Sequence, residues 1–129
     1  MKWLCERLYR KEKGFTLIEL LIVIIILAVL AGIAIPSYLT ITNRAKISAT
    51  QAEMSSIAVA LEMYNAETEL YPLTAEYPDA LEDGGYMKVV PLNDKWDAAY
   101  VYVSAGATYT LTSSGGSGDD IVYANGQLQ

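Results

Sequence analysis

The sequence predicts an α+β fold, in which a long amino-terminal α-helix with a transmembrane half and an amphipathic half packs on a small antiparallel β-sheet. Two observations support this prediction. No charged side chain occurs from Leu20 to Asn43, and these 24 residues exceed the roughly 20 that a helix needs to cross a bilayer. The last third of the chain instead contains short stretches of alternating aromatic, aliphatic and polar residues, which are typical of strands.

Charge separates the first residues from the rest of the chain. Residues 1–14 carry five basic and two acidic side chains, a net charge of +3, which leaves −9 for residues 15–129. A basic flank before an apolar segment orients that segment with its amino end in the cytoplasm. The acidic body argues against a nucleic-acid partner bound through a basic patch. Arg44 and Lys46, directly after the apolar run, are either a solvated pair or a contact for the acidic body of another chain.

A glycine and a carboxylate mark the start of the apolar segment. Residues 13–19 read Lys-Gly-Phe-Thr-Leu-Ile-Glu, which places Glu19 within the first turns of the helix. A carboxylate in a membrane helix is costly, so it either reaches the interface or pairs with a cation. A plain signal anchor would explain the apolar run and the charge asymmetry, but it gives no reason for Glu19.

This junction resembles the processing site of the superfamily of type IV pilins and type II secretion pseudopilins. The resemblance covers residues 10–46, and Pro36 stands where the family usually has a proline. It implies that a membrane prepilin peptidase cuts after Gly14, releases the basic leader and methylates the new amino terminus at Phe15. It also implies that the amino group of Phe15 pairs with Glu19 of a neighbouring subunit during filament assembly, because one helix cannot fold its own terminus back that far.

The pilin-like helix is predicted to run from near Phe15 to about Asn65. Its transmembrane and assembly half covers residues 15–42, where Pro36 is expected to kink or loosen the helix because proline lacks a backbone N–H. The second half belongs to a globular domain, residues 43–129, and its apolar side chains recur on one face. These side chains are Ile47, Met54, Ile57, Ala58, Leu61 and Tyr64.

The remainder of the chain is predicted to form a loop followed by the sheet. Two Tyr-Pro pairs and an Asp-Gly-Gly sequence favour a loop over residues 67–85, with one helical turn at residues 78–81. A sheet this small is not stable alone, so it is expected to pack on the amphipathic part of the helix. The expected strands are residues 86–90, 98–103, 108–112 and 121–123.

Two segments of the mature chain resemble the major pseudopilin of type II secretion within the superfamily, and the first lies before the predicted strand at residues 98–103 and overlaps it. Residues 93–102 are similar to its Asp-Pro-Trp-Gly-x-Pro-Tyr-x-Tyr segment, although Lys95 replaces the proline and Asp97 replaces the glycine. The single cysteine, Cys5, lies in the leader, so the mature chain cannot form the disulfide found in many pilins, which favours either the major pseudopilins or the cysteine-free pilins.

The second resembling segment is a glycine-rich loop. Residues 109–121 are similar to the loop that binds calcium in those pseudopilins, which implies calcium ligands at Asp119 and Asp120. The loop is shorter than in the family and lacks the usual earlier Asp, so backbone carbonyls, water or Asp94 would have to complete the shell. An acidic turn without metal is the alternative.

Nothing in the sequence indicates an enzyme, since it contains no His, no cysteine after the leader and no phosphate-binding loop. The resemblance implies a structural subunit of a helical pseudopilus, namely the major pseudopilin of a type II secretion system. Its implied partners are further copies of itself, minor pseudopilins, and the assembly platform of the inner membrane with its ATPase. The subunit would be a single-pass inner-membrane protein with its carboxy-terminal domain outside the cytoplasm, and then part of a periplasmic filament.

Two alternatives remain open at this point. A type IV pilin subunit would form an extracellular filament for adhesion, motility or DNA uptake. A monomeric membrane-anchored binding module belongs to another class, and both Glu19 and the cleavage site at Gly14 disfavour it.

Overall fold

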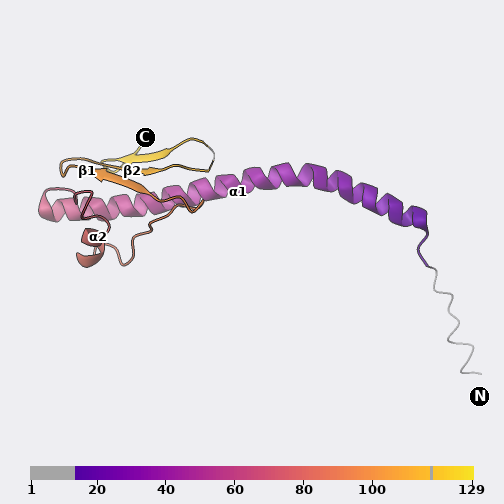
Figure 1. Ribbon diagram of the computed structural model, residues 1–129, viewed down its shortest axis with the longest axis horizontal. Helices are drawn as coiled ribbons and strands as arrows, with labels where there is room; N and C mark the ends of the chain where they lie inside the picture. The colour runs from indigo at the N-terminus through magenta and orange to yellow at the C-terminus, as the bar shows by residue number, and fades with distance from the viewer. Residues whose placement is uncertain (1–13, 117) are drawn as a thin grey trace, which may run out of the picture. The chain divides into compact units, whose positions relative to one another are not determined.

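The computed structural model describes residues 14–116 and 118–129, so the predicted leader before Gly14 lies outside the described residues. The chain divides into two compact units, Met1–Tyr38 and Leu39–Gln129, and helix α1 (Leu17–Thr68) contributes to both. The other elements belong to the second unit and are drawn in Figure 1: α2 (Asp79–Asp83), β1 (Val101–Ser104), β2 (Tyr109–Ser113), β3 (Ile121–Ala124) and β4 (Gln127–Leu128).

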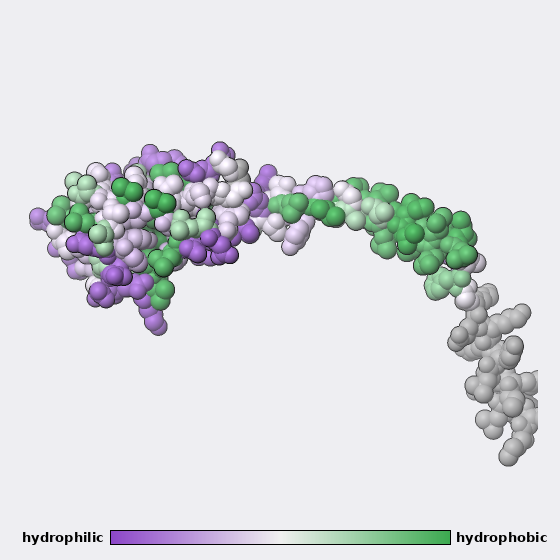
Figure 2. All heavy atoms as spheres, viewed as in Figure 1, coloured by the Kyte–Doolittle hydropathy of each residue, from purple (hydrophilic) through white to green (hydrophobic). Residues whose placement is uncertain are grey.

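The described part of the first unit is the apolar half of α1. All of its residues from Gly14 to Tyr38 are exposed in the single chain, and Figure 2 shows them as an almost uninterrupted apolar surface. The helix contains a stretch that is long and apolar enough to cross a membrane. It continues through Pro36, so the proline does not end it, and the Ser37 hydroxyl donates to the carbonyl oxygen of Ile33 at 3.3 Å.

One face of the second half of α1 forms the core of the second unit. In Figure 1 the sheet lies on one side of this half of the helix and α2 lies on the other. The buried residues of α1 are Thr50, Met54, Ile57, Ala58, Ala60 and Leu61. All of them except the polar Thr50 join one hydrophobic cluster with Leu81, Val90, Tyr100, Tyr102, Tyr109, Leu111 and Ile121. The predicted amphipathic helix and its packing on a sheet are therefore confirmed.

The sheet is antiparallel throughout, with the strands in the order β1-β2-β3-β4. Alternation sets which side chains face the helix: Tyr102 is buried in β1, whereas Val101 and Val103 are exposed. Tyrosine rings fill much of the interior. The rings of Tyr71, Tyr109, Tyr102 and Tyr77 contact one another in that order, with centroid separations of 4.7, 6.0 and 4.3 Å.

The predicted strand at residues 86–90 is wrong, because its backbone donors turn back onto α2. The N–H groups of Tyr86 and Met87 both donate to the carbonyl of Leu81, at 3.0 and 3.1 Å. The N–H of Val90 donates to the Glu82 carboxylate at 2.7 Å. These bonds cap α2, which itself confirms the helical turn expected near residues 78–81.

The other strand boundaries also differ from the prediction, and one strand was missed. β1 begins at Val101 rather than at residue 98, because a tight loop with Asp97 at φ +63° occupies the preceding residues. β4 follows β3 through Asn125 and Gly126, both in the left-handed conformation. An Asn-Gly pair is the usual sequence signal for such a two-residue hairpin, so the sequence did contain the indication of β4.

Two methionines lie on opposite sides of α1, and their substitution tests how much the buried face contributes to stability. Met54 is fully buried and Met63 is 52% exposed. Met54→Ala is expected to destabilise the second unit by about 2–5 kcal/mol, since it leaves a cavity. Met63→Ala, the matched control, should change stability by about 0.5 kcal/mol or less. Chemical unfolding of the full chain in detergent, followed by tyrosine fluorescence or circular dichroism, measures both, and equal effects would contradict the packing described here.

Candidate functional site

A reciprocal pair of side chains closes the amino end of α1, next to the predicted cleavage site. The Thr16 hydroxyl oxygen accepts from the N–H of Glu19 at 3.2 Å. In return, Glu19 Oε2 accepts from the backbone N–H and the hydroxyl of Thr16, at 2.8 and 3.0 Å. This arrangement is a capping box, which satisfies donors at the helix terminus. The Thr-x-x-Glu pattern before an apolar run is its sequence signal, so Glu19 has a local role besides the expected assembly contact.

The cap uses only one of the two carboxylate oxygens of Glu19. Both donors of Thr16 reach Oε2, and Oε1 has no hydrogen-bond donor within residues 14–116 and 118–129. The only ion pair in that part of the chain joins Lys95 to Glu53. Glu19 therefore has no cationic partner in its own described chain, although a carboxylate in an apolar helix needs one.

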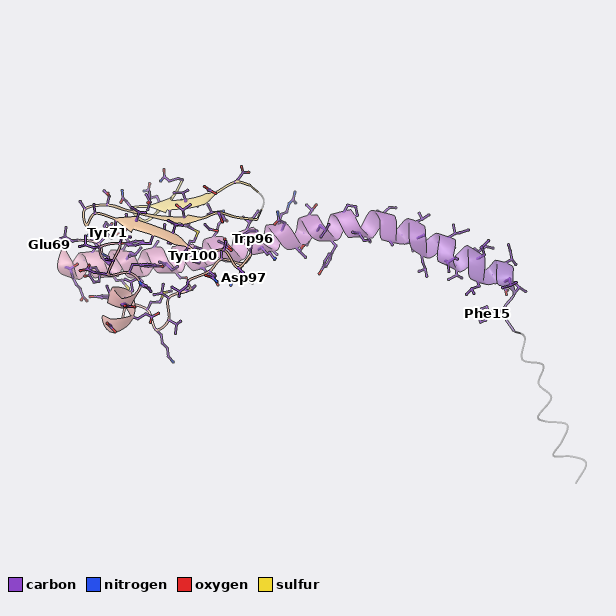
Figure 3. The ribbon with its side chains drawn as sticks, in the orientation of Figure 1. Phe15, Glu69, Tyr71, Trp96, Asp97 and Tyr100 are labelled. Carbon is purple, nitrogen blue, oxygen red and sulfur yellow. The ribbon has the colours of Figure 1, made fainter. Side chains whose placement is uncertain are left out.

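The predicted cleavage site lies directly before α1 and is accessible. Phe15 is 89% exposed, and Figure 3 shows it at the amino end of the helix. Among the described residues other than its chain neighbour, no atom lies within 4 Å of a Cβ placed on Gly14, so packing in that part of the chain does not require a glycine there. Gly14, Phe15 and Glu19 are thus neighbours at one end of α1, whereas Pro36 lies inside the same helix, away from them.

A buried carboxylate organises the loops around β1. Asp94 is 5% exposed, and its Oδ1 accepts from the N–H groups of Trp96 and Ala98 at 2.8 and 3.0 Å. Its Oδ2 accepts from the hydroxyl of Ser113 at 2.6 Å. Because Ser113 ends β2 and begins the glycine-rich loop, Asp94 ties that loop to the segment before β1.

The hydrogen bonds keep Asp94 ionised despite its burial. Burial by itself raises the pKa of this carboxyl, but the Ser113 hydroxyl, the two backbone N–H groups and the charge of Lys46 lower it by more. The net pKa lies below the ordinary value of an aspartate. Both oxygens already accept hydrogen bonds, so calcium coordination by Asp94 would have to use a remaining lone pair or replace one of these bonds.

The glycine-rich loop itself offers few ligands for the predicted calcium ion. Asp119 and Asp120 are exposed, and no group of three Asp, Glu, His or Cys side chains placed to hold a metal occurs in the described chain. Gly115, at φ +47°, turns the loop back on itself, so a Cβ there would lie 2.7 Å from the carbonyl oxygen of Asp119. The two carboxylates alone do not supply the about six to eight oxygens that calcium takes, so carbonyls and water would form most of the shell.

The first half of α1 is an exposed apolar helix whose first turn contains the capping carboxylate of Glu19. The second half packs on a small antiparallel sheet. Together they form the architecture of a pilin-like subunit. Comparison with known families agrees. The family model of the prokaryotic N-terminal methylation motif matches residues 9–35, which include Gly14, Phe15 and Glu19. The protein is therefore of the pilin-like class that carries this motif.

Further matches narrow the class to one family. The model of type II secretion system (T2SS), protein G, matches residues 37–122. The chain is 31% identical to type II secretion system core protein G of Pseudomonas aeruginosa, over 86% of this chain and 88% of that protein. It is 32% identical to the protein of the same name from Vibrio cholerae, over 79% of this chain and 77% of that protein. The chain belongs to the type II secretion system protein G family, that of the major pseudopilin.

This family consists of structural subunits, as the resemblance implied. A similarity to a pilin is also present, because the chain is 34% identical to a fimbrial protein of Neisseria meningitidis. That alignment covers 80% of this chain but only 57% of the fimbrial protein, so it fits the family of surface pili less well.

The hydrogen bonds of Asp94 predict a pH-dependent contribution to stability. Asp94→Asn is expected to cost about 1–3 kcal/mol near pH 7, because a neutral amide loses charge-assisted bonds and places an NH₂ group against other donors. A lowered pKa means that the stabilisation is present above the unfolded pKa of about 3.9 and is lost as the pH falls through the folded pKa. Unfolding curves of both proteins at about pH 7 and pH 3 should show a difference that shrinks in acid. A difference independent of pH would contradict this role.

Proposed function

We propose that this chain is the main building subunit of a pseudopilus in a type II secretion system. After cleavage at Gly14 and methylation of Phe15, subunits held in the inner membrane stack through the apolar half of α1. The sheet of each subunit then faces outward. The filament works mechanically and supports the passage of folded proteins through an outer-membrane channel.

The position of Glu19 is the observation that carries this proposal. The carboxylate lies in the first turns of an exposed apolar helix, with Oε1 unused within the described chain. Cleavage at Gly14 would create an amino group at Phe15, a cation with an ordinary pKa of about 7.7–8.0. The amino group of a neighbouring subunit supplies the charge that Glu19 lacks, and the match to the N-terminal methylation motif supports such processing.

The exposed half of α1 supports self-assembly in a second way. A row of apolar side chains, uncovered in the single chain, requires either lipid or neighbouring helices around it. In the membrane lipid covers it, and in the filament the helices of other copies do. Pro36 lies in this half of the helix, so we include it in the assembly region. Processing would need a prepilin peptidase, and extraction would need a membrane platform with an ATPase and minor pseudopilins.

The second candidate is a type IV pilin that forms a surface filament. The fimbrial relative favours it, but the family match over residues 37–122 favours the secretion pseudopilus more strongly. A monomeric membrane-anchored module would leave Glu19 without a partner.

Three variants at the amino end of α1 separate the assembly role of Glu19 from its capping role. Glu19→Gln keeps an oxygen that can accept from Thr16 but removes the charge, and Glu19→Ala removes both the charge and the acceptor. Thr16→Ala removes the two hydroxyl bonds of the cap and leaves both the charge and the backbone N–H of residue 16. Both Glu19 variants are expected to insert normally and to lose most filaments. Thr16→Ala should retain most of them. Electron microscopy and sheared-filament yield from cells that overproduce each variant measure assembly.

Mass spectrometry of the membrane form provides the control for that experiment. Each variant should begin at N-methylated Phe15, which shows that any loss of filaments occurs after processing. Normal filament yield from Glu19→Gln would remove the charge-pairing role. An amino terminus at Met1 in the unmutated protein would overturn the processing step itself.

We also propose that the glycine-rich loop binds calcium, with Asp119 and Asp120 as its carboxylate ligands. A ligand that binds only the folded state raises stability by about 2.7 kcal/mol at a hundredfold excess over Kd. The full chain in detergent should therefore melt at a higher temperature in millimolar calcium than in chelator. Magnesium should have less effect, because a loose shell rich in carbonyls suits the larger ion.

The matched control for calcium is a second acidic pair outside the loop. Asp119→Ala with Asp120→Ala should abolish the calcium effect, whereas Asp79→Ala with Asp83→Ala, which removes the same charge from α2, should leave it unchanged. An unmutated chain whose melting temperature does not respond to calcium would leave the loop as an acidic turn.

A further inference from the structure

A groove of about 590 Å³ opens between the start of the second unit's helix and two loops of the sheet. Its walls contain two cations, Arg44 and Lys46, the indole of Trp96 and the backbone of Gly116. Leu39 and neutral polar side chains from the same turns of α1 complete it. None of the described residues that line the groove is acidic.

The two cations are a large share of the positive charge on the mature chain. Residues 15–129 contain thirteen acidic side chains and only four basic ones, Arg44, Lys46, Lys88 and Lys95. Lys95 pairs with Glu53, and neither cation of the groove forms an ion pair within residues 14–116 and 118–129. The groove is therefore a local cationic site on an acidic domain.

The indole of Trp96 forms a fixed wall of this site. A Cβ on Gly116 would lie 2.1 Å from ring atoms Cδ1 and Nε1, so the ring lies directly on the glycine backbone. The Lys46 Nζ lies 6.0 Å from the ring centroid. The backbone N–H of Trp96 is held by Asp94 at 2.8 Å, and Figure 3 shows the residue in the loop before β1, beside α1. The groove is thus preformed and does not depend on a mobile aromatic side chain.

The cations occur at the level of the helix where lipid headgroups are expected. A bilayer core takes about 20 helical residues, so a span that begins at Leu20 ends near Leu39. Arg44 follows five residues later, about 7.5 Å along the axis at 1.5 Å per residue. The polar headgroup layer is about 5–8 Å thick on each side of the core, so Arg44 falls at its outer edge. Lys46 lies about 10.5 Å beyond Leu39 on the same count, just outside this layer, and its long side chain can reach back toward it. Trp, Arg and Lys are the residues that commonly occupy this layer.

We propose that this groove binds the phosphate group of an anionic phospholipid in the membrane leaflet that faces the globular domain. Arg44 and Lys46 pair with the phosphate, Trp96 packs against the glycerol region, and Leu39 contacts the first methylenes of the acyl chains. Bound lipid would hold the waiting subunit at a set height in the membrane and would be released when the subunit enters a filament. The inference rests on the membrane anchoring proposed above.

Two observations favour a lipid over the acidic surface of a second copy. The groove is concave, whereas the acidic side chains of residues 15–129 are spread over α1, α2 and several loops. The groove also begins at Leu39, where the uncharged stretch reaches the end of a membrane span. An acidic protein surface would use the cations but not this apolar end.

Trp96 provides the readout, because it is the only tryptophan after the leader. The full chain with Trp3→Phe is placed in lipid nanodiscs that contain a graded fraction of dibrominated phosphatidylglycerol or, separately, dibrominated phosphatidylcholine. Bromine quenches indole fluorescence at close range. Phosphatidylglycerol should quench Trp96 at a lower mole fraction than phosphatidylcholine does. Each cation near a membrane surface changes binding by about fivefold, so Arg44→Gln and Lys46→Gln should each raise the half-maximal fraction by about that factor.

The matched control is Lys88→Gln, which removes the same charge from an exposed lysine outside the groove and should leave the half-maximal fraction unchanged. Arg44→Lys should retain most of the preference. Inorganic phosphate, compared with sodium chloride at equal ionic strength, tests a free anion as the ligand. A lipid site keeps its preference for phosphatidylglycerol in phosphate buffer.

Three results would overturn the proposal, and they differ from a failure of membrane anchoring. Equal quenching by the two lipids would show no headgroup site. An equal loss of preference in Lys88→Gln and Lys46→Gln would show a non-specific charge effect. Loss of the preference in phosphate alone would show an anion site rather than a lipid site. No quenching by either lipid, in a chain that does not co-elute with the nanodiscs, would instead mean that the chain is not anchored in the bilayer.

Discussion

The burial of one face of α1 beneath the sheet is the interaction on which the second unit depends. The helix supplies a row of fully buried side chains, including Met54, Ile57 and Leu61, and each structural element after it contacts that row directly or through its neighbours. A four-stranded sheet of two to five residues per strand cannot form a stable core alone. The same helix continues into an apolar half with no such cover in the single chain. One helix therefore joins a unit with its own buried core to an exposed apolar segment.

Asp94 connects the loops of the second unit, as the buried face of α1 connects its helices and strands. Its two oxygens hold Trp96 on one side and Ser113 on the other, and the neighbouring Lys95 N–H donates to Thr50 of α1 at 3.4 Å. The wall of the cationic groove and the start of the glycine-rich loop are thus anchored by one buried carboxylate. Any ligand that orders the loop would also act on the Trp96–Gly116 contact, because both residues belong to the loops that Asp94 connects.

Glu19 combines two functions that are compatible in one side chain. As the last residue of the Thr16–Glu19 capping box it accepts from both donors of Thr16 through Oε2. The remaining oxygen is available to a cation from outside the described chain. A filament built on this contact would therefore not have to disrupt the end of α1 when a subunit joins. The family assignment agrees with this arrangement, since a type II secretion pseudopilin is a subunit of a pilus-like filament.

The sequence alone determined the parts of this protein that follow from local pattern. The uncharged run, the seven-residue spacing of Ile47, Met54 and Leu61, and the Lys-Gly-Phe junction were sufficient for the long helix, its two halves and the family. The Thr-x-x-Glu pattern at residues 16–19 and the Asn125-Gly126 pair also indicate the helix cap and the hairpin from sequence alone, although neither was predicted. Tertiary structure decided the rest, because it depends on which distant donors meet which acceptors. Residues 86–90 are not a strand because their N–H groups donate to Leu81 and Glu82, and Asp94 joins two loops because Ser113, nineteen residues away, donates to its carboxylate.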